Sequence, residues 1–172
     1  MVTRRMDDLD RFKNAQQTRE PGFDDAIREL RAGSKVSHWI WYIFPQLAGL
    51  GRSPMAARFG LRGIDEATAY LRDPILLARL LAAAQAVSVQ LAPGGGAQPA
   101  RLDRLMGSDI DAIKLVSSMT LFRALADRLC ADDARPELAA LVAQADLILA
   151  VAAQQGYERC AYTQQQLGLS VD

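Results

Sequence analysis

The sequence has little of what several classes of protein require. In 172 residues it holds one histidine, His38, and two cysteines, Cys130 and Cys160. The cysteines fit no zinc or Cys-x-x-Cys spacing, and neither a cysteine nor a second histidine lies near His38 in the sequence. We therefore expect no metal site, no cofactor and no local Cys-His nucleophile, with both thiols reduced and acting as small hydrophobic side chains.

Net charge and long hydrophobic runs are also missing. Twenty basic residues balance twenty acidic residues, so no long-range field attracts nucleic acid or anionic lipid. The longest apolar run, residues 138–153, is broken by Gln144 and Asp146 and is too short and too polar to span a bilayer. We expect a cytoplasmic protein with no signal peptide, no membrane segment and no nucleic-acid partner, in which local groups must hold any charged ligand.

Helical spacing and helix caps dominate what is present. Half of the residues are apolar, enough for one domain to bury a core. Phe23, Ala26, Ile27 and Leu30 follow the helical period, and Gly33 stands where helices commonly end. Further helix starts are indicated at Asp7-Asp8, Ser53-Pro54, Ile64, Asp73-Pro74, Ser108 and Pro136. The pattern predicts an all-α, compact single-domain bundle of about six to seven helices.

The single domain is expected to cover residues 1–172 and to include three less regular parts. Residues 1–6 are expected to fray, and the glycine-rich residues 92–100 to form a surface loop. Residues 157–172 form a tail that either docks through Leu167 and Leu169 or stays flexible. The run Trp39–Phe44 is compatible with a short extended segment.

The segment Ser37–Gln46 holds four of the eleven aromatic residues and the histidine. Imidazole titrates near neutral pH, which makes His38 a candidate general acid or base, and Trp39 and Trp41 are candidate walls of a ligand pocket. The plain alternative is a histidine at the edge of the core beside two packing tryptophans. From these residues alone the plain alternative is favoured.

A loop with anion-binding character follows this segment. Gly49 and Gly51 allow close approach of the backbone, Arg52 supplies charge, and Ser53 begins a helix. N–H groups at a helix start, together with Arg52, are candidate ligands of a phosphate or carboxylate. Pro54 removes one donor, and a simple loop with a helix cap is the favoured alternative.

Polar residues also mark one face of the helix expected after Ser108. Lys114, Ser117 and Ser118 are spaced so that they share this face. A Lys-Ser nucleophilic pair is one interpretation, but the order reverses the usual Ser-x-x-Lys motif. Serines that bond their own helix and a lysine that extends to water explain the pattern equally well.

The chain resembles a bacterial family of small all-α proteins of unknown function, DUF1810, whose structural relatives include the mycobacterial Rv1873-like proteins. The resemblance covers residues 7 to about 130 and is weaker in the tail. It is carried by Asp8-Leu9-Asp10-Arg11-Phe12, Ala15-Gln16, the whole run Ser37–Pro54, Tyr70-Leu71, Pro74, Asp109–Lys114 and Ser117-Ser118-Met119-Thr120-Leu121-Phe122.

The resemblance implies an all-α fold and no established activity. It also implies that one common feature is lined by His38, Trp39, Trp41, Gln46, Lys114, Ser117 and Ser118. Members of the family often carry the label calpastatin. We do not accept this label, because an inhibitor of that type is a long disordered chain, whereas this chain is apolar enough to fold.

Two functional hypotheses follow, and whether the protein is an enzyme is not decided by the sequence. The first is a pocket that binds or processes a small anionic ligand, nucleotide-like or ADP-ribose-like, by fold-level analogy with NADAR-type glycosidases. His38 and Lys114 are its candidate catalytic residues, and its candidate ligand-binding residues are Trp39, Trp41, Gln46, Arg52, Ser53, Ser117 and Ser118. The alternative is a non-enzymatic protein interaction module with an exposed patch of Trp39, Trp41 and Tyr42. The sequence predicts no oligomeric state.

Overall fold

The computed structural model describes residues 6–92, 94 and 99–171, and these residues form ten α-helices and no β-strand. Six helices have nine residues or more: α1 (Met6–Thr18), α2 (Phe23–Arg31), α5 (Ile64–Arg72), α6 (Pro74–Leu91), α8 (Asp109–Cys130) and α9 (Pro136–Gln154). Four are short: α3 (Ile40–Ile43), α4 (Pro54–Phe59), α7 (Leu102–Leu105) and α10 (Ala161–Gln166). The all-α prediction is confirmed, and the short helices account for the larger number.

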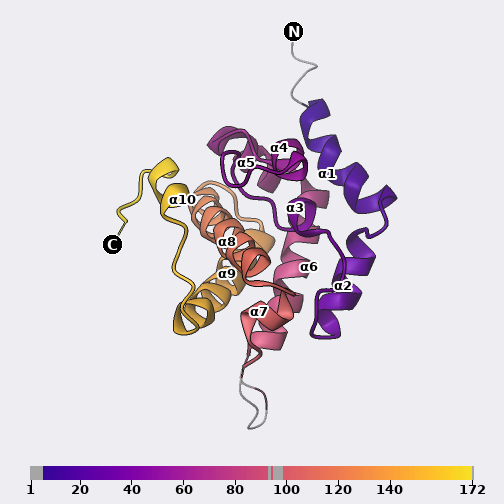
Figure 1. The fold of residues 1–172 in the computed structure, drawn as a ribbon. Helices are drawn as coiled ribbons and strands as arrows, with labels where there is room; N and C mark the ends of the chain where they lie inside the picture. The colour runs from indigo at the N-terminus through magenta and orange to yellow at the C-terminus, as the bar shows by residue number, and fades with distance from the viewer. Residues whose placement is uncertain (1–5, 93, 95–98, 172) are drawn as a thin grey trace.

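Three long helices form the centre of the bundle. α8 packs against α9, and α9 also packs against α6. α2 and α5 contact α6, α5 also contacts α8, and α1 contacts the one-turn helix α3. Figure 1 shows α1 and α2 on one side of this centre and α10 on the other side, against α8. α3 contacts both α1 and α8, and α4 contacts α3, so these two short helices lie between α1 and α8.

Local capping chemistry explains where the helices begin. The Ser53 hydroxyl accepts a hydrogen bond from the Ala56 N–H, and the Asp73 carboxylate accepts from the first turn of α6. Ser108 accepts from the Asp111 N–H in the same way. Pro136 occupies the first turn of α9, where its missing N–H has no cost. The predicted starts of α4, α6, α8 and α9 are confirmed.

The interpretation of Trp39–Phe44 as extended backbone is wrong. The Ile43 N–H donates to the Trp39 carbonyl and the Phe44 N–H to the Ile40 carbonyl, so the segment closes one helical turn, α3. This turn buries the side chains of Ile40 and Ile43 together. Extended pairing occurs only later among the described residues, as an isolated bridge between Leu47 and Leu61.

The N-terminus, the glycine-rich loop and the tail were predicted to be the less regular parts of the domain. Helix α1 already begins at Met6, whereas residues 1–5 lie outside the described residues. Most of the predicted 92–100 loop also lies outside them, and Ala92, Gly94 and Pro99 are not helical. The tail docks on the domain: Leu167 is buried, and its carbonyl accepts a hydrogen bond from Arg128. Leu169 stays exposed and does not take part.

Among the described residues, two helices are apolar enough to span a membrane by length and composition alone, α6 and α9. Half of the apolar window of α6 and a third of that of α9 are buried inside the fold. Because core helices pass the same test, this composition is weak evidence for a membrane span. A cytoplasmic location remains a prediction.

Candidate functional site

A narrow crevice opens between α3, α4 and α8. Its volume is about 10 Å³, which is room for one water molecule. Most of its wall is apolar, and its polar members are the Trp41 indole, the Gln46 amide and the Lys114 ammonium. The lining residues are Ile40, Trp41, Phe44, Gln46, Ala56, Phe59, Gly60 and Lys114. The structure therefore brings together three of the residues that the sequence predicted as site residues.

Charge at the crevice is shared among three side chains. The Lys114 Nζ atom lies 4.7 Å from the centre of the Trp41 ring and 3.3 Å from one carboxylate oxygen of Asp111. The other Asp111 oxygen pairs with Lys35 at 2.6 Å. Lys35 is the more deeply buried lysine, with 5% of its side chain exposed against 18% for Lys114. One carboxylate thus serves two ammonium groups, and it holds Lys114 at the longer distance.

Trp39 lies in the core and does not line the crevice. Its side chain is fully buried, and its indole N–H donates to the Glu29 carboxylate at 2.8 Å. Glu29 also accepts from the backbone N–H groups of Val36 and Ser37 and from the Ser37 hydroxyl. Burial raises the pKa of Glu29, but these hydrogen bonds outweigh it and lower the pKa to about 2. Trp39 and Glu29 therefore fix the segment that precedes α3, and no face of Trp39 is open to a ligand.

His38 is exposed and is not among the residues that line the crevice. Its backbone carbonyl accepts a long hydrogen bond, 3.4 Å, from the hydroxyl of Tyr42. Tyr42 is fully buried, so Trp39 and Tyr42 cannot contribute exposed rings to the predicted aromatic patch. Of the three aromatic residues proposed for that patch, Trp41 alone is partly exposed.

The two serines of α8 are buried. Ser118 lies one turn after Lys114 on the same helix face, and its hydroxyl has no hydrogen-bond partner in the described part of the chain. The indole N–H of Trp41 is also buried without a partner there. Buried polar groups are normally paired, and two of the three buried side-chain groups without a partner in the described residues lie here, the third being the Thr163 hydroxyl. Ser117 is buried one residue earlier, next to the crevice face of the helix.

The loop after α3 connects two walls of the crevice. Gln46 donates from its side-chain amide to the Leu50 carbonyl, which ties the loop to the crevice wall. Arg52 is exposed and forms no ion pair with any residue that the structure describes. Ser53 caps α4, and its hydroxyl and carbonyl already accept the N–H groups of Ala56 and Ala57. Few helix donors remain for an anion, so the predicted anion site depends mainly on the Arg52 guanidinium.

Three polar residues of the site were not identified from the sequence: Glu29, Lys35 and Asp111. The spacing of Asp111 and Lys114, three residues apart at a helix start, was the available signal for one ion pair. The contact between Lys35 and Asp111 joins distant parts of the chain, and no local pattern indicates it.

The architecture defines a small all-α domain, and comparison with known proteins assigns its family. The sequence model of the DUF1810 family, which is described as a protein of unknown function, matches residues 6–134. The chain therefore belongs to the DUF1810 family. No curated protein matches the chain.

A solved structure supports the same assignment. The chain is similar to the conserved hypothetical protein Rv1873 from Mycobacterium tuberculosis, with 32% sequence identity and a TM-score of 0.66. The match covers 95% of this chain and 98% of that protein, so it extends through α9 and into the tail. The comparisons thus establish family and fold and leave the function to be argued from the site.

Proposed function

We propose that the protein binds a small anionic molecule at the crevice beside Trp41. The observation that carries this proposal is the position of the Lys114 ammonium over the Trp41 ring, 4.7 Å from its centre. A cation beside an aromatic face offers both charge and a stacking surface at one place.

The charges around Lys114 favour an anion. Lys114 and Lys35 share the single carboxylate of Asp111, and Lys114 has the longer contact. A ligand carboxylate or phosphate near Lys114 gains a charge-assisted hydrogen bond and leaves the pair between Asp111 and Lys35 in place. The Trp41 indole N–H, which has no partner among the described residues, offers a further hydrogen-bond donor in the crevice wall.

The size of the crevice sets the mode of binding. Room for one water molecule does not admit a nucleotide, so a flat ligand must displace the Lys114 side chain from the Trp41 ring. A lysine side chain moves readily because its four-carbon stem is flexible. In the proposed complex a base stacks on Trp41, Lys114 moves to its phosphate, and Arg52 holds a second phosphate. In this proposal the ligand is nucleotide-like or ADP-ribose-like and lies at the widened crevice.

The geometry supports binding more than chemical processing. Lys114 forms no hydrogen bond with Ser117 or Ser118, so no activated hydroxyl is assembled in the described structure. His38 does not line the crevice. Within this proposal, Lys114 provides positive charge that binds the anionic ligand and takes no part in a chemical step.

A second candidate function is supported by exposed apolar side chains. Val36, Ile110 and Ile113 are 77%, 66% and 55% exposed. Val36 and Ile110 are chain neighbours of the paired Lys35 and Asp111, and Ile113 precedes Lys114, so these exposed side chains come from the segments next to the crevice. A protein partner that covers this surface is the alternative to a small ligand.

Thermal denaturation with AMP, ADP-ribose and inorganic phosphate tests the first proposal. A ligand that binds the folded state stabilises it by about 2.7 kcal/mol at a concentration of 100 Kd. We expect stabilisation of the wild-type protein and its loss in Lys114→Ala, whereas Arg104→Ala, which removes an exposed cation on α7, keeps it. Equal stabilisation of both variants would contradict binding at the crevice.

A further inference from the structure

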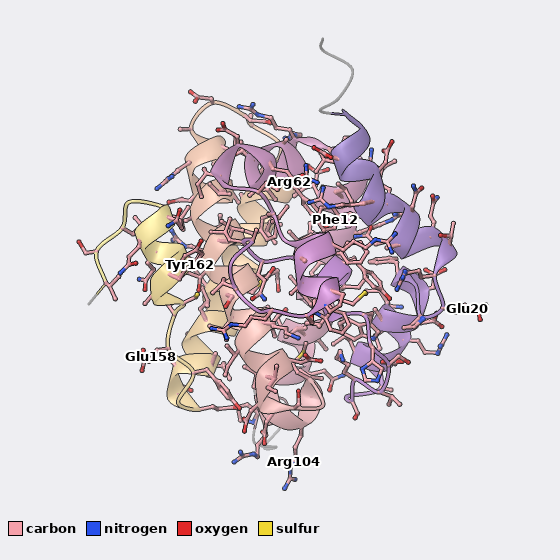
Figure 2. The ribbon with its side chains drawn as sticks, turned by 45° about the horizontal axis from the view of Figure 1, so that its top comes forward. Phe12, Glu20, Arg62, Arg104, Glu158 and Tyr162 are labelled. Atoms are coloured by element: carbon pink, nitrogen blue, oxygen red, sulfur yellow. The ribbon has the colours of Figure 1, made fainter. Side chains whose placement is uncertain are left out.

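The tail helix α10 contacts the loop that forms one wall of the crevice. The Tyr162 hydroxyl donates to the Ala48 carbonyl at 3.2 Å. A Cβ atom at Gly49 would lie 2.9 Å from the same hydroxyl, so the tyrosine tip rests directly on the loop backbone. Figure 2 shows Tyr162 on the side of the domain formed by α10, beside α8 and this loop.

The residue held by Tyr162 is connected to the crevice wall. The Ala48 N–H donates to the Leu61 carbonyl at 2.8 Å, and the Leu61 N–H donates to the Gln46 carbonyl at 2.9 Å. Gly60 packs so closely that a Cβ atom there would lie 2.9 Å from the Ala48 Cα atom. Gln46 and Gly60 both line the crevice. A shift of Ala48 therefore moves two lining residues.

α10 packs against the rest of the domain on one side only. The helix has six residues and packs mainly against α8. Between the tail and α9 lies an open groove of about 510 Å³, lined in part by Leu149, Ala153 and Gln164. The short helix is therefore supported by α8 and by the loop, with solvent on the side towards α9.

The packed side of α10 contains an unpaired polar group that would bind water if the helix detached. Thr163 is fully buried, and its hydroxyl has no hydrogen-bond partner in the region that the structure describes. Release of the helix would hydrate this hydroxyl. The docked position is thus opposed by an unpaired group and supported by Leu167, the Arg128 hydrogen bond and the Tyr162 hydroxyl.

From these contacts we propose that α10 is a releasable strap that holds the loop around Ala48 against the domain and keeps the crevice narrow. Release of Tyr162 frees Ala48, and the wall formed by Gln46 and Gly60 then moves outward. The use of this opening for ligand entry rests on the proposed anion-binding function. The strap itself rests on the contacts of α10 alone.

Hydrogen exchange of backbone amides, measured on the full chain without ligand, tests the strap. The reporters are the amides of Ala48 and Leu61, which are bonded across the crevice wall, and the reference is the amide of Ile148 in the buried core of α9. In Tyr162→Ala we expect faster exchange at the two reporters and an unchanged rate at the reference. In Thr163→Val, which removes the unpaired hydroxyl, we expect exchange at the reporters to slow by about tenfold.

Leu169→Ala is the matched control, because Leu169 lies in the same tail and is exposed. It should leave both reporters unchanged. Unchanged exchange at the two reporters in Tyr162→Ala would overturn the strap, because it would show that Tyr162 does not restrain the loop. An equal acceleration at Ile148 would also overturn it, because it would show only global destabilisation. Because no ligand is present, failure here leaves the anion proposal standing, and a failed ligand screen leaves the strap standing.

Discussion

Lys114 lies over Trp41 at 4.7 Å, and in the same cluster Lys35 lies over Trp39 at 5.1 Å from the ring centre. The two lysines meet at the carboxylate of Asp111. One pair is buried in the core, whereas the other borders the crevice and is partly exposed. The two tryptophans therefore have different roles, the first in holding the fold and the second in offering a surface to a ligand.

This difference predicts losses of stability of different size for two similar substitutions. Trp39→Phe leaves a cavity and removes the hydrogen bond to Glu29, so it should lower the free energy of unfolding by on the order of 2–4 kcal/mol. Trp41→Phe removes an unpaired indole N–H and should cost less than about 1 kcal/mol. Urea denaturation of both variants measures the two losses in stability. Equal losses would argue against different roles for the two tryptophans.

Removal of the shared carboxylate should destabilise the fold. Asp111→Ala leaves the buried Lys35 ammonium without its partner, and we expect a loss on the order of 3 kcal/mol in the free energy of unfolding. Asp103→Ala removes the partner of the exposed Arg101 and should have no measurable effect. A similar loss in both variants would show that the pair between Lys35 and Asp111 has no special role.

Glu29 should make part of the stability depend on pH in acid. Its pKa is about 2 in the folded protein against an ordinary value of 4.5, because its hydrogen bonds outweigh the effect of burial. Its contribution is therefore complete above about pH 4.5 and is lost as the pH falls towards 2. In Glu29→Gln the free energy of unfolding should be lower at neutral pH and should change less between pH 4.5 and 2. Denaturation at several pH values measures this, with the exposed Glu137→Gln as control. An unchanged acid slope in Glu29→Gln would contradict the prediction.

Arg52 should distinguish phosphorylated from unphosphorylated ligands. In Arg52→Ala we expect the affinity for ADP, which carries the second phosphate, to fall by about 1–3 kcal/mol of binding free energy, as for loss of a charge-assisted hydrogen bond, and the affinity for adenosine to stay the same. Isothermal titration calorimetry of both ligands measures the difference. An equal loss for both would assign Arg52 a structural role in the loop.

The sequence predicts those parts of the fold that depend on neighbouring residues. Ser53, Asp73 and Ser108 cap helices within their own turn, so the residue types suffice to locate α4, α6 and α8. The one-turn helix α3 was missed, because a single turn has no repeat that separates it from extended backbone.

The site was predictable only in part for a related reason. The density of aromatic residues marked Trp39 and Trp41 equally. In the fold, Trp39 is buried and bonded to Glu29, whereas Trp41 is partly exposed. The charge on Lys114 was visible in the sequence, whereas its shared partner depends on how Lys35 meets Asp111 in the folded chain. Which tryptophan borders a crevice is therefore a property of the tertiary structure.

The most direct test of ligand binding at the crevice uses the indole N–H signals in a nitrogen-15 NMR spectrum. The chain has two tryptophans, so it gives two such signals, and Trp39→Phe assigns them. On titration with ADP-ribose, we predict that the Trp41 signal moves with saturation and the Trp39 signal stays in place, and that Lys114→Ala abolishes the movement. A Trp41 signal that does not move, or that moves equally in Lys114→Ala, would contradict the proposal that this ligand binds between Lys114 and Trp41.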